Sequence, residues 1–274
     1  MRPPSPSIPE KEFLFVALKQ SLRLDGRLPL EMRVPTLTFG PELGYYSRRS
    51  KQKWSNHRPS DRSRACSQYT RKYRLWPPAS TKLVGSPSEE EITITRMLDK
   101  VLRRSDAVDK ESLCILAGQR VWHLRLTLHC LSDAGNMLDC ACLAGIVALK
   151  HFRRPDIEVT GDEVTIHPPS ERAPIPLSMH HTPFCFTFAF FPDAETSPVL
   201  DPSQLEHRLS AGLMSIALNA QRELCVVQKL GGVPLGMDEI LRLVDVAVRK
   251  AKELDQLVGE RLKEDWLGRN VELL

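Results

Sequence analysis

The segment of residues 45–85 constrains the fold most, because it cannot supply one side of a hydrophobic core. Between residues 47 and 80 the only leucine, isoleucine, valine or methionine is Leu75. The segment also holds eleven lysines and arginines against one acid, Asp61. So few aliphatic side chains and so much charge cannot offset the chain entropy lost on folding. We therefore expect the core to come from the sequence on either side.

The composition of residues 45–85 leaves three interpretations open. All four tyrosines and two of the four tryptophans lie among its basic residues, and such a mixture can stack on bases and pair with phosphates. A basic arm that binds nucleic acid is therefore one interpretation. A solvated, unfolded insert and an altered reading frame or exon are the others, and we expect the segment to be disordered or aberrant.

The formal net charge of +4 comes from this segment alone. The remaining sequence carries 27 basic and 33 acidic residues, a net charge of −6. The basic balance of the whole chain is therefore poor evidence for nucleic-acid binding.

Apolar periodicity predicts a mixed α and β chain on either side of the segment. Helical spacing favours helices, which we expect over residues 10–22, from residue 89 to about 102, over 139–152 and over 237–266. Alternation or short apolar runs favour strands, which we expect at residues 30–39, 122–128, 157–159, 164–166, 184–191, 213–218 and 222–228.

The sequence shows no signal for a membrane span, for secretion or for a disulfide framework. The longest apolar run, residues 184–191, is far shorter than the ~20 residues of a membrane span. The proline-rich N-terminus lacks the apolar core of a secretory signal. The seven cysteines are odd in number and scattered, which argues against a disulfide framework. We expect no membrane contact and a place in the cytosol or nucleus.

No motif of an established catalytic or metal site is present. Gly-rich phosphate loops, G-x-S-x-G and H-E-x-x-H are all missing. His180 and His181 are adjacent and would point to opposite faces of a strand, so they would not bind one ion together. Cys140 and Cys142 lie in an apolar run without a second ligand pair, which predicts buried thiols. We expect no metal and no cofactor.

Five aspartates lie near predicted turns, where they could in principle support hydrolysis or a metal. Turn chemistry explains their placement without catalysis. They are Asp133, Asp139, Asp162, Asp193 and Asp201.

A group of basic residues in the helix predicted from residue 89 is the candidate RNA-binding site. Offsets of four and seven place Arg96, Lys100 and Arg103 on one helical face, with Arg104 beside them. This basic strip (Arg96, Lys100, Arg103, Arg104) is either a phosphate-binding surface or a solvated helix face.

Several motifs, in the same order along the chain, are similar to one family. They are Arg23-Leu24-Asp25-Gly26-Arg27, Asp109 to Cys114, Ala117-Gly118, Val121-Trp122, His151 to Asp156, Gly161 to Thr165, Pro176 to His181, Phe184 to Phe191 and Asp201-Pro202. They resemble the RNase PH-like ring subunits of the RNA exosome, of the ribosomal RNA-processing protein 45 type. The resemblance covers residues 10–43 and 86 to about 260.

The resemblance implies an α+β, RNase PH-like fold (ribosomal protein S5 domain 2-like). It also implies a division of the chain. Residues 1–44 would form the N-terminal helix and first strand, 45–85 the aberrant basic segment, 86–195 the remainder of the first domain, and 196–266 the C-terminal subdomain with its long helix.

The implied function is that of a non-catalytic ring subunit, which scaffolds the exosome and lines the RNA path for 3'–5' processing and degradation. The implied partners are other RNase PH-like ring subunits, cap subunits, RNA and an associated catalytic nuclease. The implied locations are the nucleus, the nucleolus and the cytoplasm. Relatives carry a basic strip facing RNA where Arg96, Lys100 and Arg103 fall.

The resemblance also implies that this chain lacks phosphorolytic activity. Active relatives have an acid in the strand that follows the motif matched by Asp201-Pro202, and Leu213 stands at that position here. His207 stands where relatives often have another acid. An aliphatic side chain can neither transfer a proton nor hold a metal.

Residues 45–85 depart from the family pattern, and the sequence leaves two alternative functions open. Relatives have alternating strands over residues 45–85, so a chain without those strands would fold or assemble poorly. A phosphorolytic 3'–5' exoribonuclease would need an acid near Leu213 and a phosphate site. A free RNA-binding protein would need the basic aromatic segment to bind on its own.

Overall fold

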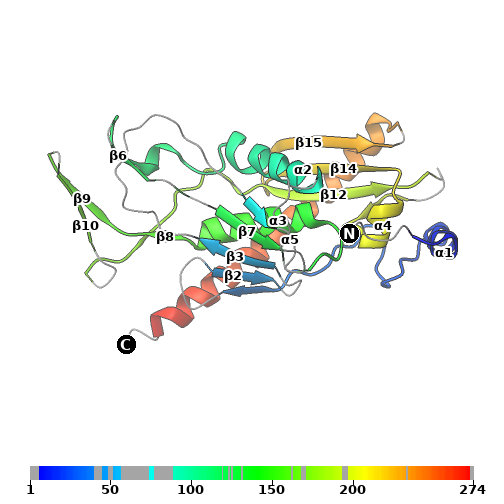
Figure 1. Ribbon diagram of the computed structural model, residues 1–274, viewed down its shortest axis with the longest axis horizontal. Helices are drawn as coiled ribbons and strands as arrows, with labels where there is room; N and C mark the ends of the chain where they lie inside the picture. The colour runs from blue at the N-terminus through cyan, green and yellow to red at the C-terminus, as the bar shows by residue number, and fades with distance from the viewer. Residues whose placement is uncertain are drawn as a thin grey trace. The chain divides into compact units, whose positions relative to one another are not determined.

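The computed structural model is shown in Figure 1. It describes residues 6–39, 45–48, 52–56, 74–76, 89–118, 120–122, 124, 126–130, 132–161, 163–167, 171–192, 197–232 and 234–271. The chain forms two compact units, each made of segments that are distant in sequence. The first contains residues 1–35, 133–142 and 183–256, and the second contains residues 36–132, 143–182 and 257–274. The division into consecutive domains stays a prediction.

The first unit contains a four-stranded antiparallel sheet with the strand order β13-β12-β14-β15. Its strands are β12 (Phe184–Phe190), β13 (Val199–Leu200), β14 (Gly212–Leu218) and β15 (Leu224–Gly231). Every residue of β12 is buried. A strand covered on both faces needs a continuous apolar run rather than alternation, so the run at residues 184–191 correctly predicted a central strand.

Two helices of the first unit, α1 and α4, begin at well-formed N-terminal caps. Helix α1 (Ile8–Lys19) has a capping box between Ser7 and Glu10, and the short α4 (Gln204–Leu209) has one between Ser203 and Glu206. Each box satisfies backbone N–H groups that the first helical turn leaves free. Leu14 and Leu18 of α1 pack in a small apolar cluster with Ala189, Phe191 and Val199.

The second unit contains a five-stranded sheet with the order β1-β2-β3-β7-β4. Its strands are β1 (Leu37–Phe39), β2 (Tyr45–Arg48), β3 (Gln52–Asn56), β4 (Arg74–Trp76) and β7 (Leu126–Cys130). Strand β4 runs parallel to β7, and the other pairs are antiparallel.

Three of these strands correct an expectation about residues 45–85. The segment was expected to be disordered or aberrant and to build no buried strand or helix face, whereas the structure forms β2, β3 and β4 within it. They join the sheet through backbone pairing with β1 and β7, which does not depend on side-chain hydrophobicity. Residues 49–51, 57–73 and 77–85 lie outside the described part of the chain.

The other elements of the second unit surround these strands in the sequence. The helical ones are α2 (Glu89–Leu98), the π-helix η1 (Asp99–Arg104), the 3-10 turn η2 (Glu111–Leu113) and most of α3 (Met137–His151). Three two-stranded ribbons pair β5 (Cys114–Leu116) with β6 (Arg120–Val121), β8 (Arg153–Arg154) with β11 (Ile175–Pro176), and β9 (Ile157–Thr160) with β10 (Glu163–Ile166).

The longest helix of the described residues is α5 (Met237–Val271), with 35 residues. Its apolar side chains recur at the expected helical spacing, and Leu243, Ala247, Ala251 and Leu254 are buried. Charged residues fill its other faces. Among the described residues, no helix combines the length and the apolar character that a membrane crossing requires.

The burial of β12 yields a stability prediction. Phe186 is fully buried, whereas Phe13 of α1 is 66% exposed. We expect Phe186→Ala to lower the free energy of unfolding by about 3–5 kcal/mol, because it leaves a cavity. The matched change Phe13→Ala should cost no more than about 0.5 kcal/mol. Urea unfolding of the full chain, followed by circular dichroism, measures both, and equal losses would contradict the assigned core.

Candidate nucleic-acid interface and buried polar centre

The basic strip lies on one continuous helical segment, formed by α2 and η1. Arg96 is exposed in the last turn of α2, and the other three residues belong to η1. The Arg104 side chain is 68% exposed and that of Arg103 is 37% exposed. The segment is basic at its C-terminal end, where cations are favoured by the helix dipole.

Asp99 forms ion pairs with two of the four basic residues of this strip. Its carboxylate lies 2.7 Å from Arg103 Nε and 3.3 Å from Arg104 Nε. The two guanidinium groups are therefore already paired within the strip, although both remain partly open to solvent. Phosphate groups would compete with one carboxylate for two arginines.

The π-helix changes which residues share a face. In η1 the hydrogen bonds reach one residue further than in an α-helix, as in the bond that Ser105 N donates to Lys100 O. The wider turn brings Arg104, which α-helical spacing left beside the strip, to the same carboxylate as Arg103. The structure thus brings two of the four predicted residues together at Asp99.

The first unit contains a buried polar centre that the sequence did not predict as a site. It joins side chains from three distant segments of the chain. Its members are Arg23, Arg27, Arg33, Asn136, Asp139, Thr187, Asp201, Glu206 and Ser215.

Arg23 and Glu206 form a bidentate ion pair inside this centre. Arg23 Nε donates to Glu206 Oε1 at 2.9 Å, and Nη2 donates to Oε2 at 2.6 Å. The remaining N–H groups of Arg23 donate to the carbonyl oxygens of Leu200, Asp201 and Glu31. All five guanidinium donors therefore have acceptors, which a fully buried arginine requires.

Asp201 is the second ion-pair partner and binds two arginines. Arg33 Nη2 donates to Asp201 Oδ1 at 2.6 Å and Arg33 Nε donates to Oδ2 at 2.8 Å. Arg27 Nη1 and Asn136 Nδ2 donate to the same carboxylate at 3.2 and 2.7 Å. Burial alone would raise the pKa of Asp201, but the hydrogen bonds and charge of Arg33 outweigh it and hold the pKa below its ordinary value.

A glycine allows the loop before α3 to approach Asp201. Gly135 has a φ of +86°, and a Cβ added there would lie 2.4 Å from the backbone nitrogen of Gln204. Only glycine fits such a contact. The same loop also accepts bonds from Arg33, at the carbonyl oxygens of Ala134 and Gly135.

Asp139, in the first turn of α3, extends the centre toward the sheet. Its carboxyl group accepts the backbone N–H and the hydroxyl of Thr187, both at 2.7 Å. It also accepts Asn136 Nδ2 at 2.8 Å. Thr187 Oγ1 in turn lies 3.0 Å from Ser215 Oγ on β14. Burial raises the pKa of Asp139 to about 6, against the lowering effect of the Thr187 and Asn136 hydrogen bonds.

Leu213 and His207 lie at the positions that the family resemblance links to catalysis. Leu213 on β14 packs against the apolar cluster that contains Leu14 and Phe191. His207 lies in α4, directly after the buried Glu206. The cluster that Leu213 packs against is made of aliphatic and aromatic side chains.

The other candidates from the sequence are not brought together as a metal site. His181 Nε2 lies 2.6 Å from the carbonyl oxygen of Ser105, and His180 lies 3.9 Å from Asp109. Cys140 and Cys142 are buried, as predicted, and burial raises the pKa of the Cys142 thiol. Within the described ranges, no three histidine, cysteine or acidic side chains gather as metal ligands would.

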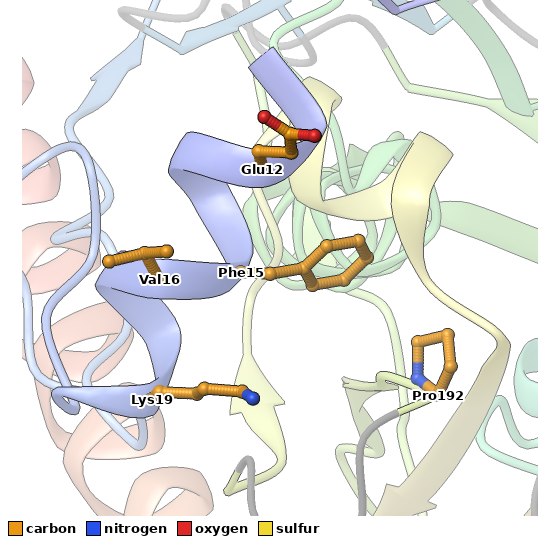
Figure 2. A pocket seen from close by; sticks show the side chains of 5 residues that line it. All are labelled: Glu12, Phe15, Val16, Lys19 and Pro192. Atoms are coloured by element: carbon orange, nitrogen blue, oxygen red, sulfur yellow. The ribbon is translucent and has the colours of Figure 1, made fainter. Parts of the chain in front are cut away.

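One surface pocket lies between α1 and Pro192, in the first unit. Figure 2 shows Phe15 and Lys19 pointing from α1 toward Pro192, with Glu12 and Val16 completing the lining. Its volume is about 450 Å³. A single lysine and a single glutamate give it no set of converging polar groups, so it has no evident chemistry.

The buried polar centre was not predicted from the sequence, because each of its acids has a separate local explanation. Asp139 and Asp201 follow or precede turns, and turn chemistry was a sufficient explanation for both. The available signal was the co-occurrence of Arg23, Arg27 and the Asp201-Pro202 motif. Nothing in their spacing showed that residues 168 positions apart, Arg33 and Asp201, would be in contact.

The raised pKa of Asp139 gives a pH-dependent stability. The folded chain holds this proton more tightly than the unfolded chain, whose value is 3.8. The resulting stabilisation is present below pH ~4 and is lost as the pH rises through about 6, by up to about 3 kcal/mol. We expect the difference in unfolding free energy between wild type and Asp139→Asn to fall by this amount between pH 4 and 7.

Urea unfolding at a series of pH values measures that difference. The control is Leu138→Ala, the preceding residue, which removes apolar contacts but no titratable group. Its effect should be the same at every pH. A pH-independent effect of Asp139→Asn would show that the Asp139 carboxyl titrates alike in the folded and unfolded chain.

Two domain models of one protein family match this chain. Domain 1 of the 3' exoribonuclease family matches residues 49–155, and domain 2 of that family matches residues 181–250. The first match begins inside residues 45–85. The resemblance therefore extends into the segment that the sequence analysis had set apart from the family.

Solved structures show the same fold. An exosome of Archaeoglobus fulgidus with RNA bound to the active site superposes with a TM-score of 0.68 at 22% identity, covering 90% of this chain and 97% of that chain. An archaeal exosome core gives a TM-score of 0.66 at 22% identity, covering 92% of this chain and 96% of that one. The α+β, RNase PH-like fold is thereby confirmed.

Curated relatives define the family more narrowly. Exosome complex component rrp45 of Schizosaccharomyces pombe is 36% identical, over 98% of this chain and 94% of the relative. Exosome complex component RRP45 of Homo sapiens is 38% identical over 93% of this chain, and the chain spans 60% of the human protein's length. With this identity along nearly the full length of the fission-yeast relative and both domain matches in place, the chain belongs to the RRP45 family of RNase PH-fold proteins.

Proposed function

We propose that the chain is a non-catalytic ring subunit of the RNA exosome, which scaffolds the complex and lines the RNA path for 3'–5' processing and degradation. The observation that carries the proposal is the match to rrp45 of Schizosaccharomyces pombe, which extends over 94% of that exosome component. The partners would be other RNase PH-like ring subunits, cap subunits, RNA and a separate catalytic nuclease. The complex would act in the nucleus, the nucleolus and the cytoplasm.

The packing of Leu213 supports the absence of catalysis. Phosphorolysis needs a group that transfers a proton, and Leu213 instead adds its side chain to an apolar cluster with Leu14 and Phe191. Neighbouring Ser215 is engaged with Thr187 in the buried polar centre. Strand β14 thus uses these side chains for packing and internal hydrogen bonds.

One observation favours the alternative, a phosphorolytic 3'–5' exoribonuclease. The pKa of Asp139, raised to about 6, is close to the value that suits a general acid at neutral pH. However, both of its carboxyl oxygens already accept hydrogen bonds from Thr187 and Asn136. A catalytic acid must reach the substrate, so this arrangement supports the structural role instead.

The basic strip would supply the contact with RNA. Its charges lie on a helical segment, where arginines and lysines can pair with successive phosphates without reading base sequence. Asp99 reduces the net charge of the strip and fixes Arg103 and Arg104. We propose that Arg96, Lys100, Arg103 and Arg104 make sequence-independent phosphate contacts that Asp99 weakens.

Reconstitution tests the subunit assignment. We expect the full chain to co-assemble with purified exosome ring subunits, and the assembled ring, without its associated nuclease, to show no phosphate-dependent RNA decay. Decay would be measured with a labelled single-stranded RNA, with and without inorganic phosphate. Failure to assemble would reject the ring assignment. Phosphate-dependent decay of the RNA by the purified chain, in the absence of the other subunits, would support the alternative.

Two opposite changes test the basic strip. Arg96→Ala should weaken binding of single-stranded RNA by the full chain and reduce the salt dependence, because one phosphate contact is lost. Asp99→Asn should strengthen binding a few-fold, because it releases two arginines. Arg261→Ala, an exposed arginine of α5 paired with Glu264, serves as the control. Fluorescence anisotropy at several salt concentrations measures all three, and equal affinities would reject the strip as an RNA contact.

A further inference from the structure

The helical segment that carries the basic strip ends at Ser105, which closes the π-helical turn. Ser105 N donates to Lys100 O at 3.2 Å, and its hydroxyl donates to Val101 O at 2.6 Å. The next residue, Asp106, has a φ of +55°, a left-handed conformation that is uncommon outside glycine. A π-turn is itself a rare form of helix. The end of η1 therefore depends on contacts from elsewhere in the chain.

Two adjacent histidines of the same unit supply such contacts. His180 donates its backbone N–H to Ala107 O at 3.0 Å. His181 reaches the helix end with its side chain, because its Nε2 lies 2.6 Å from the Ser105 carbonyl oxygen. A carbonyl oxygen can only accept, so Nε2 carries the ring proton. His181 thus donates to one of the carbonyl groups that a helix leaves free at its C-terminus.

The bond to Ser105 is what a histidine adds at position 181. The other ring nitrogen, Nδ1, is buried and has no hydrogen-bond partner among the described residues. A buried polar atom without a partner is unfavourable, and an apolar ring of similar shape would avoid that cost. The favourable difference between His181 and a phenylalanine here is therefore its hydrogen bond to the helix end.

The π-turn that Ser105 closes decides which side chains Asp99 reaches. In an α-helix the neighbours of a residue lie three and four positions on, which would give Asp99 only Arg103 of the two arginines. The π-turn reaches one residue further, and Arg104 Nε also lies 3.3 Å from the Asp99 carboxylate. Relaxation to α-helical spacing would move Arg104 away from Asp99 and off the face that holds Arg103.

We propose that His181 is a positioning residue for the RNA contact of the basic strip. Its Nε2–H holds the Ser105 carbonyl and so keeps Arg103 and Arg104 on one face of the segment. The inference rests on the proposed function, because it assigns His181 to the same strip. In this role His181 acts through the end of the helix: a fixed turn lets both arginines meet neighbouring phosphates without a further ordering cost.

Two substitutions separate the hydrogen bond of His181 from its packing. His181→Phe keeps a ring but removes the donor, whereas His181→Gln supplies an amide N–H in its place. We expect His181→Phe to weaken binding of single-stranded RNA by the full chain about five-fold. The slope of log affinity against log salt concentration should fall by about 0.7, as for one lost phosphate contact. His181→Gln should stay within about two-fold of the wild type, because it restores the donor.

His180→Phe is the matched control. The His180 side chain is 58% exposed and its ring lies 3.9 Å from Asp109, away from the Ser105 carbonyl. The substitution removes the same ring nitrogens one residue earlier and leaves the backbone bond to Ala107 in place. It should therefore bind RNA within about two-fold of the wild type. Fluorescence anisotropy at several salt concentrations measures all of these variants.

Arg104→Ala shows whether the effect of His181 passes through the strip. Alone, it should weaken RNA binding about five-fold. Combined with His181→Phe it should cost little more, because the displaced Arg104 makes no contact to lose. Hydrogen–deuterium exchange reports on the turn itself: the Ser105 amide should exchange at least about ten-fold faster in His181→Phe and close to the wild-type rate in His181→Gln.

The outcomes separate this inference from the proposed function. No RNA binding by the wild type, or an affinity that Arg104→Ala leaves unchanged, would reject the strip assignment and this role of His181 with it. If Arg104→Ala weakens binding while His181→Phe binds and exchanges like the wild type, only the positioning role is wrong. Equal weakening by His181→Phe and His181→Gln, or additive effects of His181→Phe and Arg104→Ala, would also overturn it, since the effect would then bypass the hydrogen bond or Arg104.

Discussion

The carboxylate of Asp201 binds together the three segments that make up the polar centre of the first unit. Arg27 and Arg33 reach it from the N-terminal segment, and Asn136 reaches it from the start of α3. Taking a carboxylate and two guanidinium groups out of water is costly, and direct ion pairing offsets that cost only when every donor and acceptor is satisfied. The bidentate geometry of Arg33 and the full set of Arg23 donors meet this condition, whereas the buried Oδ1 of Asn136 has no hydrogen-bond partner among the described residues.

The described acids of the same centre take part in contacts within the fold. Glu206 caps α4 and binds Arg23, and Asp139 is held by Thr187 and Asn136. These acids are therefore engaged with the chain itself, and Leu213 places an aliphatic group in an apolar cluster. These acids hold the loops of the first unit together.

The second unit carries the basic strip, which lies on one helical segment formed by α2 and η1. Asp99 of the same segment pairs with two of its arginines, Arg103 and Arg104. The π-helical turn brings both arginines to this one carboxylate. The charge that the strip presents therefore depends on an acid that lies beside it in the same segment.

The sequence by itself determined those elements whose signal is local. The apolar run of β12, the periodicity of α5 and the small-residue helix α3 were predictable, because burial on a known face requires a fixed spacing. The tertiary structure alone decided that β2, β3 and β4 join a sheet, because backbone hydrogen bonds with β1 and β7 do not depend on hydrophobic side chains. It also decided the pairing of Arg33 with Asp201, since no local spacing encodes a contact between residues so far apart in the chain.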